Sequence, residues 1–172
     1  RFNFCAMAST GRDINFDLKR IEGYRNFCNK LWNASRFILI TCEGYNYKDS
    51  LSTQDATIFD KWIMYKLDNV VSDFKKYTMN YRFDLMANSI YEFVWNEYCD
   101  WYLEIAKNNI NDTTKCFLIY SIIRIIKVCH PITPFITEEI WSELYKKGFV
   151  DDASLIRSSF PSQIRISKED DI

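Results

Sequence analysis

Helix-breaking residues are scarce in this sequence. Its 172 residues include only four glycines and three prolines, although 17% of the residues are aromatic. A fold of many short strands needs frequent turns, and turns depend on glycine and proline. Few breakers and many large apolar residues therefore favour long helices and a single domain with a substantial core.

The usual signatures of metal sites and disulfide frameworks are also missing. His130 is the only histidine, and no two of the six cysteines form a CxxC pair. The common zinc spacings are thus excluded, and we predict no metal site. A chain this large and apolar does not need disulfides, so we expect reduced, mostly buried cysteines in an intracellular protein.

Membrane and targeting segments are lacking as well. The chain has no uncharged apolar run of about 18 residues, which predicts no transmembrane helix and no membrane partner. Its first residues contain neither a starting Met nor the features of a signal or transit peptide. We therefore expect a piece of a larger protein.

Catalytic motifs are absent from the chain. Neither G-x-x-x-x-G-K-[ST] nor G-x-G-x-x-G occurs, so no phosphate-cradling loop is predicted. His130 precedes a proline at an expected helix end, where a packed or dipole-stabilised histidine is typical. Glu97 and Glu104 interrupt an apolar stripe, and we expect them to pair with basic residues of a neighbouring helix, because unpaired buried charge is rare. The alternative is a catalytic carboxylate pair, which is disfavoured because nothing nearby supplies a nucleophile, a metal or a histidine. We predict no catalytic residue.

Hydrophobic periodicity and capping signals predict a series of helices joined by short connections. The expected spans are the end of a helix within 1–9, then 18–40, 53–78, 82–107, 113–130 and 134–147. We expect Ser52 and Asp55 to cap the third helix, Thr113 the fifth, and Thr133 with Pro134 to begin the last. Short connections favour antiparallel neighbours, so we predict an all-α bundle over residues 1–147 and a loosely packed, irregular C-terminal extension over residues 148–172.

Two of these helices have faces whose residues indicate which side packs in the core. At about 100° per residue, the core face of the second helix comprises Ile21, Tyr24, Cys28, Leu31, Trp32, Ser35, Ile38 and Leu39. On the opposite side, Lys19, Asn26, Lys30, Asn33 and Phe37 form one line. The expected core stripe of the fourth helix is Phe83, Met86, Ala87, Ile90, Val94, Trp101 and Ile105, widened by Tyr91, Trp95, Tyr98 and Tyr102. The fourth helix is therefore expected at the bundle centre.

The line on the second helix combines groups that suit single-stranded RNA. Lysines bind phosphates, asparagines hydrogen-bond base edges, and a phenylalanine offers a stacking face. Arg36 flanks the line, and residues 18–37 carry five basic residues and one acid in a chain of net charge −1. The ordinary alternative is a solvated face with one stray aromatic. From the residues alone, an RNA-binding module, a protein-interaction module and a structural brace all stay open.

Three runs of sequence resemble the valyl-tRNA synthetases over residues 2–147. They are GRDINF (11–16) followed by EGYRNFCNKLWNASRF (22–37), then YEFVWNEYCDWYLE (91–104), then HPITPFITEEIW (130–141). The last run is shared loosely with the synthetases for isoleucine, leucine and methionine, whereas the first is more specific to the valine enzymes.

The resemblance implies an all-α antiparallel bundle of the class I synthetase anticodon-binding type. The parent enzyme would esterify valine to its tRNA using ATP. The H-x-G-H and K-M-S-K-S signatures of that family are absent here, so we expect ATP to bind only in a catalytic domain that this sequence lacks. The chain itself would not be catalytic, and its partners would be the anticodon arm of tRNA(Val) and that catalytic domain.

The resemblance also implies which residues touch the anticodon. It places contacts on the second helix, at Lys19, Lys30, Arg36 and Phe37, and the wheel adds Asn26 and Asn33. Trp95, Asn96 and Tyr98 of the neighbouring helix are weaker candidates. The family often ends in a coiled-coil arm, for which residues 149–172 are too short, so we expect weak affinity. We expect a monomer in the cytoplasm, with an organellar enzyme as the alternative compartment, and a protein-interaction or structural helical module as the alternative function.

Overall fold

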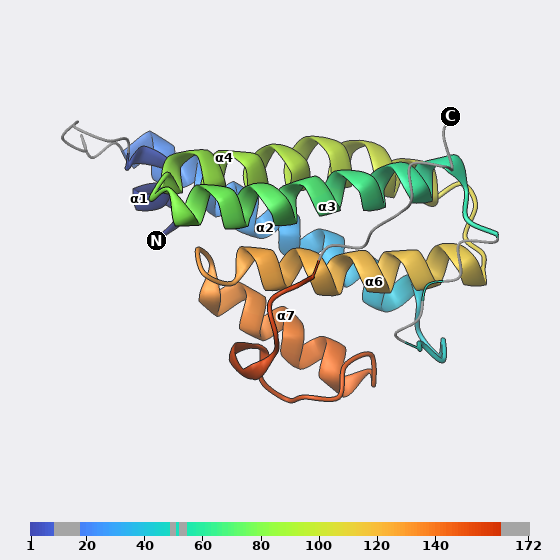
Figure 1. The fold of residues 1–172 in the computed structure, drawn as a ribbon. Coiled ribbons are helices and arrows are strands. Elements are labelled where there is room, and N and C mark those ends of the chain that lie inside the picture. The colour runs from blue at the N-terminus through green and yellow to red at the C-terminus, as the bar shows by residue number, and fades with distance from the viewer. Residues whose placement is uncertain (9–17, 49–50, 52–54, 163–172) are drawn as a thin grey trace.

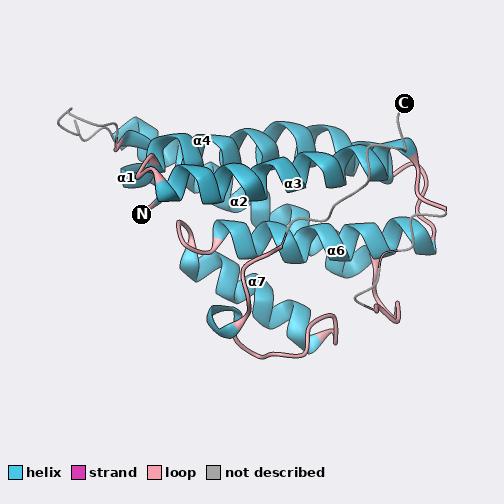
Figure 2. Cartoon of the chain, viewed as in Figure 1, coloured by secondary structure: helices cyan, strands magenta, loops and turns pink. Residues whose placement is uncertain are grey.

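The computed structural model describes residues 1–8, 18–48, 51 and 55–162, with residues 18–20 described by their backbone alone. Its elements are α1 (Phe2–Met7), α2 (Leu18–Thr41), α3 (Ile58–Met79), α4 (Phe83–Glu92), η1 (Phe93–Tyr102), α5 (Leu103–Ala106), α6 (Asp112–Cys129), α7 (Pro134–Lys146) and η2 (Leu155–Arg157). No strand occurs in these described ranges (Figure 2). The all-α prediction is confirmed.

The helices form two layers that α2 joins. In Figure 1, α3 and α4 lie side by side, α6 and α7 form a second pair, and α2 runs behind both. Helix α2 contacts η1, α6 and α7, so its sides face different neighbours. This placement decides which of its residues stay open to solvent.

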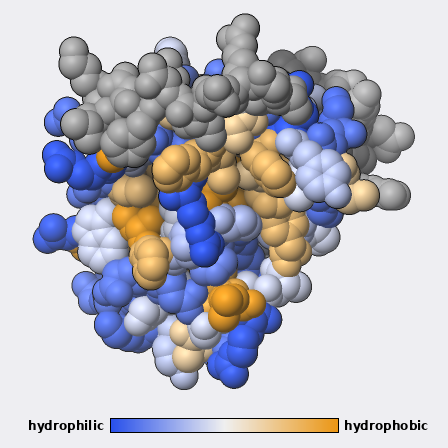
Figure 3. Space-filling view, turned by 90° about the vertical axis from the view of Figure 1, so that its left-hand side faces the viewer, coloured by the Kyte–Doolittle hydropathy of each residue, from blue (hydrophilic) through white to orange (hydrophobic). Residues whose placement is uncertain are grey.

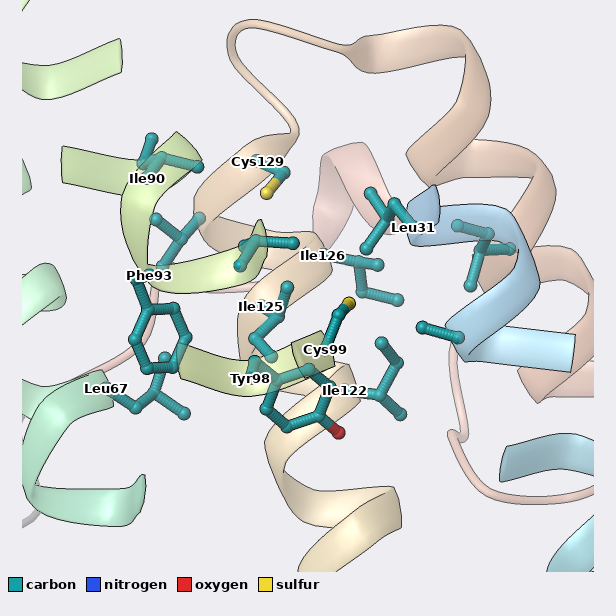
Figure 4. Packing of buried hydrophobic residues seen from close by; sticks show 14 of the residues in the cluster. Leu31, Leu67, Ile90, Phe93, Tyr98, Cys99, Ile122, Ile125, Ile126 and Cys129 are labelled. Atoms are coloured by element: carbon teal, nitrogen blue, oxygen red, sulfur yellow. The ribbon is translucent and has the colours of Figure 1, made fainter. Parts of the chain in front are cut away.

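The core lies where the two layers and α2 meet. Figure 4 shows Tyr98 among isoleucines of α6, with Leu31 of α2 on one side and Leu67 of α3 on the other. All three side chains are at most 1% exposed. Burial of this much aliphatic and aromatic surface is the main stabilising term of such a bundle. The cysteines of the described residues are free thiols, and three of the six are buried.

Helix α3 begins later than predicted, at a different cap. The Asp60 backbone N–H donates to Thr57 Oγ1 over 3.1 Å, and the Thr57 backbone N–H donates to Asp60 Oδ2 over 2.9 Å. In this capping box, each side chain accepts a hydrogen bond from a backbone N–H that has no partner within the helix. The Tyr102 hydroxyl donates a further 2.6 Å bond to Asp60. The predicted cap at Asp55 is therefore wrong, while Ser52 lies outside the described residues.

The two later caps also differ in detail from the prediction. Asn111 caps α6 by accepting a 2.8 Å bond from the Thr114 backbone N–H, so the cap is not Thr113. Pro134 occupies the first turn of α7 as predicted. Thr133 is the N-cap residue of α7, also as predicted, but its hydroxyl donates to the Cys129 carbonyl over 3.0 Å and makes no cap bond to α7.

Helices α4, η1 and α5 form one continuous helical segment, which is here called the rod (residues 83–107) and includes the C-cap residue Lys107. Its middle, η1, is a π-helix of ten residues. A π-helix bonds i to i+5 and takes more residues per turn, so positions drift away from an α-helical wheel. That drift explains one wrong prediction: Trp101, expected in the core, is 64% exposed. It also places Tyr98 and Tyr102, expected at the margin, in the fully buried centre.

The two glutamates in the predicted stripe behave differently. Glu97 pairs with Lys66 of α3 at 2.7 Å, as expected for a carboxylate beside a neighbouring helix. Glu104 is exposed and pairs with Lys107, one turn further along the same helical segment, at 2.6 Å. The prediction of a partner on a neighbouring helix is therefore confirmed for Glu97 and wrong for Glu104.

Residues 149–162 pack firmly, against the expectation of a loose extension. Phe149 and Leu155 are buried, and the Trp141 indole N–H donates to the Asp152 carbonyl over 2.7 Å. The Phe160 ring lies 4.6 Å from that of Phe74 on α3. Apolar burial ties this segment to the bundle, although it holds only a short 3₁₀ turn. Within the described ranges, no helix combines the length and apolarity needed to cross a bilayer.

Candidate nucleic-acid interface

The buried face of α2 is rotated from the one predicted. Phe27, Leu31 and Ile38 are 0% exposed, whereas Tyr24 and Trp32 of the expected core face are only half-buried. Consecutive helical residues are separated by about 100°, so Lys30 and Phe37 lie on a flank of the buried face. They are not opposite it, as predicted. The cause is tertiary, because α2 packs against η1 as well as α6 and α7.

The flank toward η1 carries four of the predicted site residues, here called the α2 strip: Asn26, Lys30, Asn33 and Phe37. Both asparagines are exposed. Lys19 belongs to the same line, but its side chain lies outside the described residues. The strip is thus an open row of two amides, a cation and a ring on one regular helix.

Lys30 is held by two groups of the rod. Its Nζ lies 2.5 Å from Asp100 Oδ1 and 4.1 Å from the centroid of the Trp95 ring. The side chain keeps 24% of its surface exposed and Asp100 keeps 50%. A salt bridge this open to water is worth little, on the order of 0–1 kcal/mol. A stronger anion could therefore draw Lys30 away from the carboxylate.

Phe37 is half-buried, packed against the core, and covered by a lysine of the rod's end. Lys107 Nζ lies 5.3 Å from the Phe37 ring centroid. Exposed cation–π contacts are weak, about 0.5–1 kcal/mol, so the flexible lysine can move off the ring. The site therefore offers one aromatic ring with a weakly held cation beside it.

The weaker candidates on the rod separate into surface and core. Trp95 is half-buried and stacks on Tyr91 at 5.5 Å and 11°, and Asn96 is exposed. Tyr98 is 0% exposed, and its hydroxyl lies 2.8 Å from Ser121 Oγ. Burial excludes Tyr98 from any contact with a ligand, so this candidate is withdrawn. The π-helical register is the reason.

Arg36 faces away from the α2 strip. It is exposed and lines a pocket of about 360 Å³ between α2 and α7, together with Glu139 and Glu143. Because it follows Ser35 and precedes Phe37, it points about 100° around the helix from the strip. The structure therefore brings together Asn26, Lys30, Asn33 and Phe37, and it separates Arg36 from them.

Sequence reasoning missed the charged rod residues that meet the strip. Asp100 and Lys107 gave no signal, because only tertiary packing places them against α2. Below the strip, burial raises the pKa of the Cys99 thiol to about 12. The thiol is therefore neutral at physiological pH, and the charges of the site are those of its side chains at the surface.

A second surface feature lies at the end of the molecule that carries α1. Apolar side chains gather on that face in Figure 3. A groove of about 450 Å³ is lined there by Asn3, Phe135 and neighbours from α2. Phe135 is 92% exposed, while both polar atoms of the buried Asn3 amide have no hydrogen-bond partner among the described residues. Among the described residues, no three His, Cys, Asp or Glu side chains come together as metal ligands.

Comparison with known proteins agrees with the resemblance seen in the sequence. A family model described as the anticodon-binding domain of tRNA ligase matches residues 60–171. A valine–tRNA ligase of Legionella pneumophila (strain Lens) is 45% identical over 170 residues, which cover 94% of this chain and 18% of that protein. One from Xanthomonas oryzae pv. oryzae (strain PXO99A) is 43% identical over 168 residues, covering 94% and 17%.

A third valine–tRNA ligase, from Psychrobacter arcticus, is 46% identical over 159 residues, or 84% of this chain and 16% of that protein. The chain thus spans less than a fifth of the length of these relatives. The matched family accounts for more than half of the chain, and the helical architecture agrees with it. The chain belongs to the family of anticodon-binding domains of tRNA ligases.

Proposed function

We propose that this chain binds the anticodon arm of tRNA(Val) as one domain of a valine–tRNA ligase, which would esterify valine to its tRNA using ATP. The observation that carries the proposal is the α2 strip, where Lys30, Phe37 and two exposed amides share one flank of a regular helix. The similar proteins are valine–tRNA ligases. Catalysis and ATP binding are assigned to parts of the parent protein beyond this chain.

In this proposal the strip reads unpaired loop bases. Lys107 moves off the Phe37 ring, and a splayed base stacks there in its place. Lys30 exchanges Asp100 for a phosphate of the loop. Asn26 and Asn33 hydrogen-bond base edges or sugars, which single-stranded loops expose. Each exchange replaces a weak, solvent-exposed contact of the free protein with a contact to RNA, so little is lost when the RNA arrives.

A titration against the tRNA(Val) anticodon stem-loop tests the proposal. Phe37→Ala should weaken binding by about 1–3 kcal/mol, the usual worth of one stacked base. Lys30→Ala should lower the slope of log K against log salt by about 0.7–0.9, one phosphate contact.

The chain offers matched controls for both variants. Phe135→Ala removes an exposed ring of α7 that does not belong to the strip, and Lys146→Ala removes a lysine that pairs with a carboxylate as Lys30 does. Both should bind like the wild type. Unchanged affinity for Phe37→Ala and Lys30→Ala together would contradict the assignment.

The groove at Asn3 favours a second role, contact with the catalytic part of the parent enzyme. Its rim carries the Phe135 ring, which is 92% exposed and which a partner surface could cover. Covering this exposed ring would remove apolar surface from water, which stabilises a contact. Phe135→Ser should leave the melting temperature of this chain unchanged and lower that of the full-length parent. Equal melting of both parent forms would reject the contact.

The proposal also takes the chain to act as a monomer in a cytoplasmic enzyme. Light scattering of the chain at micromolar concentration should give the mass of one copy. A concentration-dependent rise in mass would contradict the monomer.

A further inference from the structure

Gly23 occupies an interior position of α2, where the fold gives no reason for a glycine. Glycine is the poorest helix former after proline, since it loses the most backbone freedom on folding. A Cβ added at Gly23 would meet no atom of the described residues within 4 Å. Its backbone is helical within α2, a conformation open to every residue except proline. Neither packing against the described residues nor backbone geometry therefore requires glycine here.

The open space at Gly23 is part of a groove between α2 and α4. The groove measures about 310 Å³ and is lined by Gly23, Tyr24, Asn88 and Tyr91. That size lies at the lower end of the range for small-ligand sites, about 300–1,000 Å³. A side chain at Gly23 would project into this space, so the missing Cβ keeps the groove open.

The walls of the groove are held in place by aromatic packing. The Tyr24 ring lies 4.6 Å from that of Phe2. The Tyr91 ring stacks at 5.4 Å on Phe27 and at 5.5 Å on Trp95. Rings fixed in this way need little ordering when a ligand arrives, which favours binding. Asn88 adds an exposed amide, with two donors and an acceptor, at the rim.

The groove is continuous with the α2 strip. Gly23 lies about two helical turns, or roughly 10 Å, before Lys30 on the same side of the helix. Trp95, which Lys30 covers, stacks directly on Tyr91 of the groove wall. One strand of RNA that contacts Lys30 and Asn26 would therefore reach the groove with its next nucleotides.

We propose that this groove is a further nucleotide subsite, in which the sugar–phosphate backbone passes over Gly23 and Asn88 hydrogen-bonds the base or ribose. The subsite rests on the proposed function, because its ligand is the same RNA. A glycine lets a ligand backbone approach a helix more closely than any side chain would. The groove thus extends the RNA-binding surface from the strip across to α4.

The test is a pair of measurements whose changes should have opposite signs. Gly23→Ala should raise the melting temperature by about 2–4 °C, because alanine is the better helix former. The same variant should bind the tRNA(Val) anticodon stem-loop about tenfold more weakly, the effect of about 1.4 kcal/mol. Asn88→Ala should weaken binding without changing the melting temperature, and Asn69→Ala on α3 serves as the matched control with unchanged binding.

The outcomes separate the subsite from the function it rests on. If the wild type fails to bind the stem-loop, both are overturned. If Lys30→Ala weakens binding while Gly23→Ala and Asn88→Ala bind like the wild type, only the subsite is overturned. A lower melting temperature for Gly23→Ala would also overturn the subsite. It would mean that the added methyl group clashes with a neighbouring part of the protein, so that packing would explain the glycine.

Discussion

Helix α2 and the rod lie against each other, and both are long, aromatic and amphipathic. They differ in regularity. Helix α2 is α-helical throughout, and the predicted strip residues Asn26 and Asn33 are exposed. The rod contains a π-helical middle, and there Trp101 is exposed while Tyr98 is buried, the reverse of the prediction. A regular helix thus keeps the predicted residues together on one side, although tertiary packing sets which side of α2 is buried, whereas a π-helix changes the relative positions themselves.

Helix α2 and the rod also contribute different groups to the surface. The α2 strip presents a cation, amides and a ring to solvent, whereas the rod supplies the buried wall behind them and the carboxylate that holds the cation. The Lys30–Asp100 pair joins the two segments. Variants that affect one segment and leave the other unchanged test this difference between α2 and the rod.

The largest expected effect belongs to the buried wall of the rod. Tyr98→Ala should lower the free energy of unfolding by about 3–5 kcal/mol, because it leaves a cavity at a fully buried site. Urea denaturation followed by circular dichroism measures the change. A loss below about 1 kcal/mol would mean that the π-helical register does not bury this ring.

The next effect concerns the cap that ties the start of α3 to the rod. Asp60→Ala removes the capping box and leaves the buried Tyr102 hydroxyl without its 2.6 Å partner. We expect a loss of about 1–3 kcal/mol in the free energy of unfolding. Asp55→Ala, at the exposed turn residue first predicted to cap, is the control and should be neutral. Equal effects of the two variants would contradict the placement of the cap.

A smaller effect should appear in binding, where the two segments meet. Asp100→Asn frees Lys30 for phosphate and should raise affinity for the anticodon stem-loop by up to about fivefold, the worth of an exposed ion pair. Asp112→Asn removes the same charge from a carboxylate that pairs with Lys115, away from the strip. Equal gains for both variants would attribute the change to net charge alone.

The smallest effect is expected at Trp101. Because 64% of its surface is exposed, Trp101→Ser should change the free energy of unfolding by about 0.5 kcal/mol or less. Thermal melting beside the wild type measures this. A loss above about 2 kcal/mol would restore the α-helical register and the buried position first predicted for this ring.

Helix positions and fold class were predictable because they depend on local periodicity and on scarce breakers. The span of α2 agrees with the prediction to within one residue at its C-terminal end. Caps were predicted less well. Thr57 and Asn111 cap α3 and α6, whereas other residues were predicted to cap these helices. Several Ser, Thr, Asn and Asp residues compete near each helix start, and tertiary contacts such as Tyr102 to Asp60 select among them.

The site was predictable only in part, for a similar reason. Asn26, Lys30, Asn33 and Phe37 share a flank because helical spacing alone places them there. The partners that hold Lys30 and cover Phe37 come from the rod, far away in the chain. No local pattern reveals such long-range neighbours.

The amino-acid sequence by itself determined the helices, the antiparallel bundle, the line of residues on α2 and the family to which the chain belongs. These depend on periodicity, on breakers and on sequence similarity, which are all readable along the chain. The tertiary structure alone decided the π-helical register of the rod, the burial of Tyr98, the orientation of Arg36 away from the strip, and the groove at Gly23. These depend on which helices pack together, because burial and close contact are properties of neighbours in space.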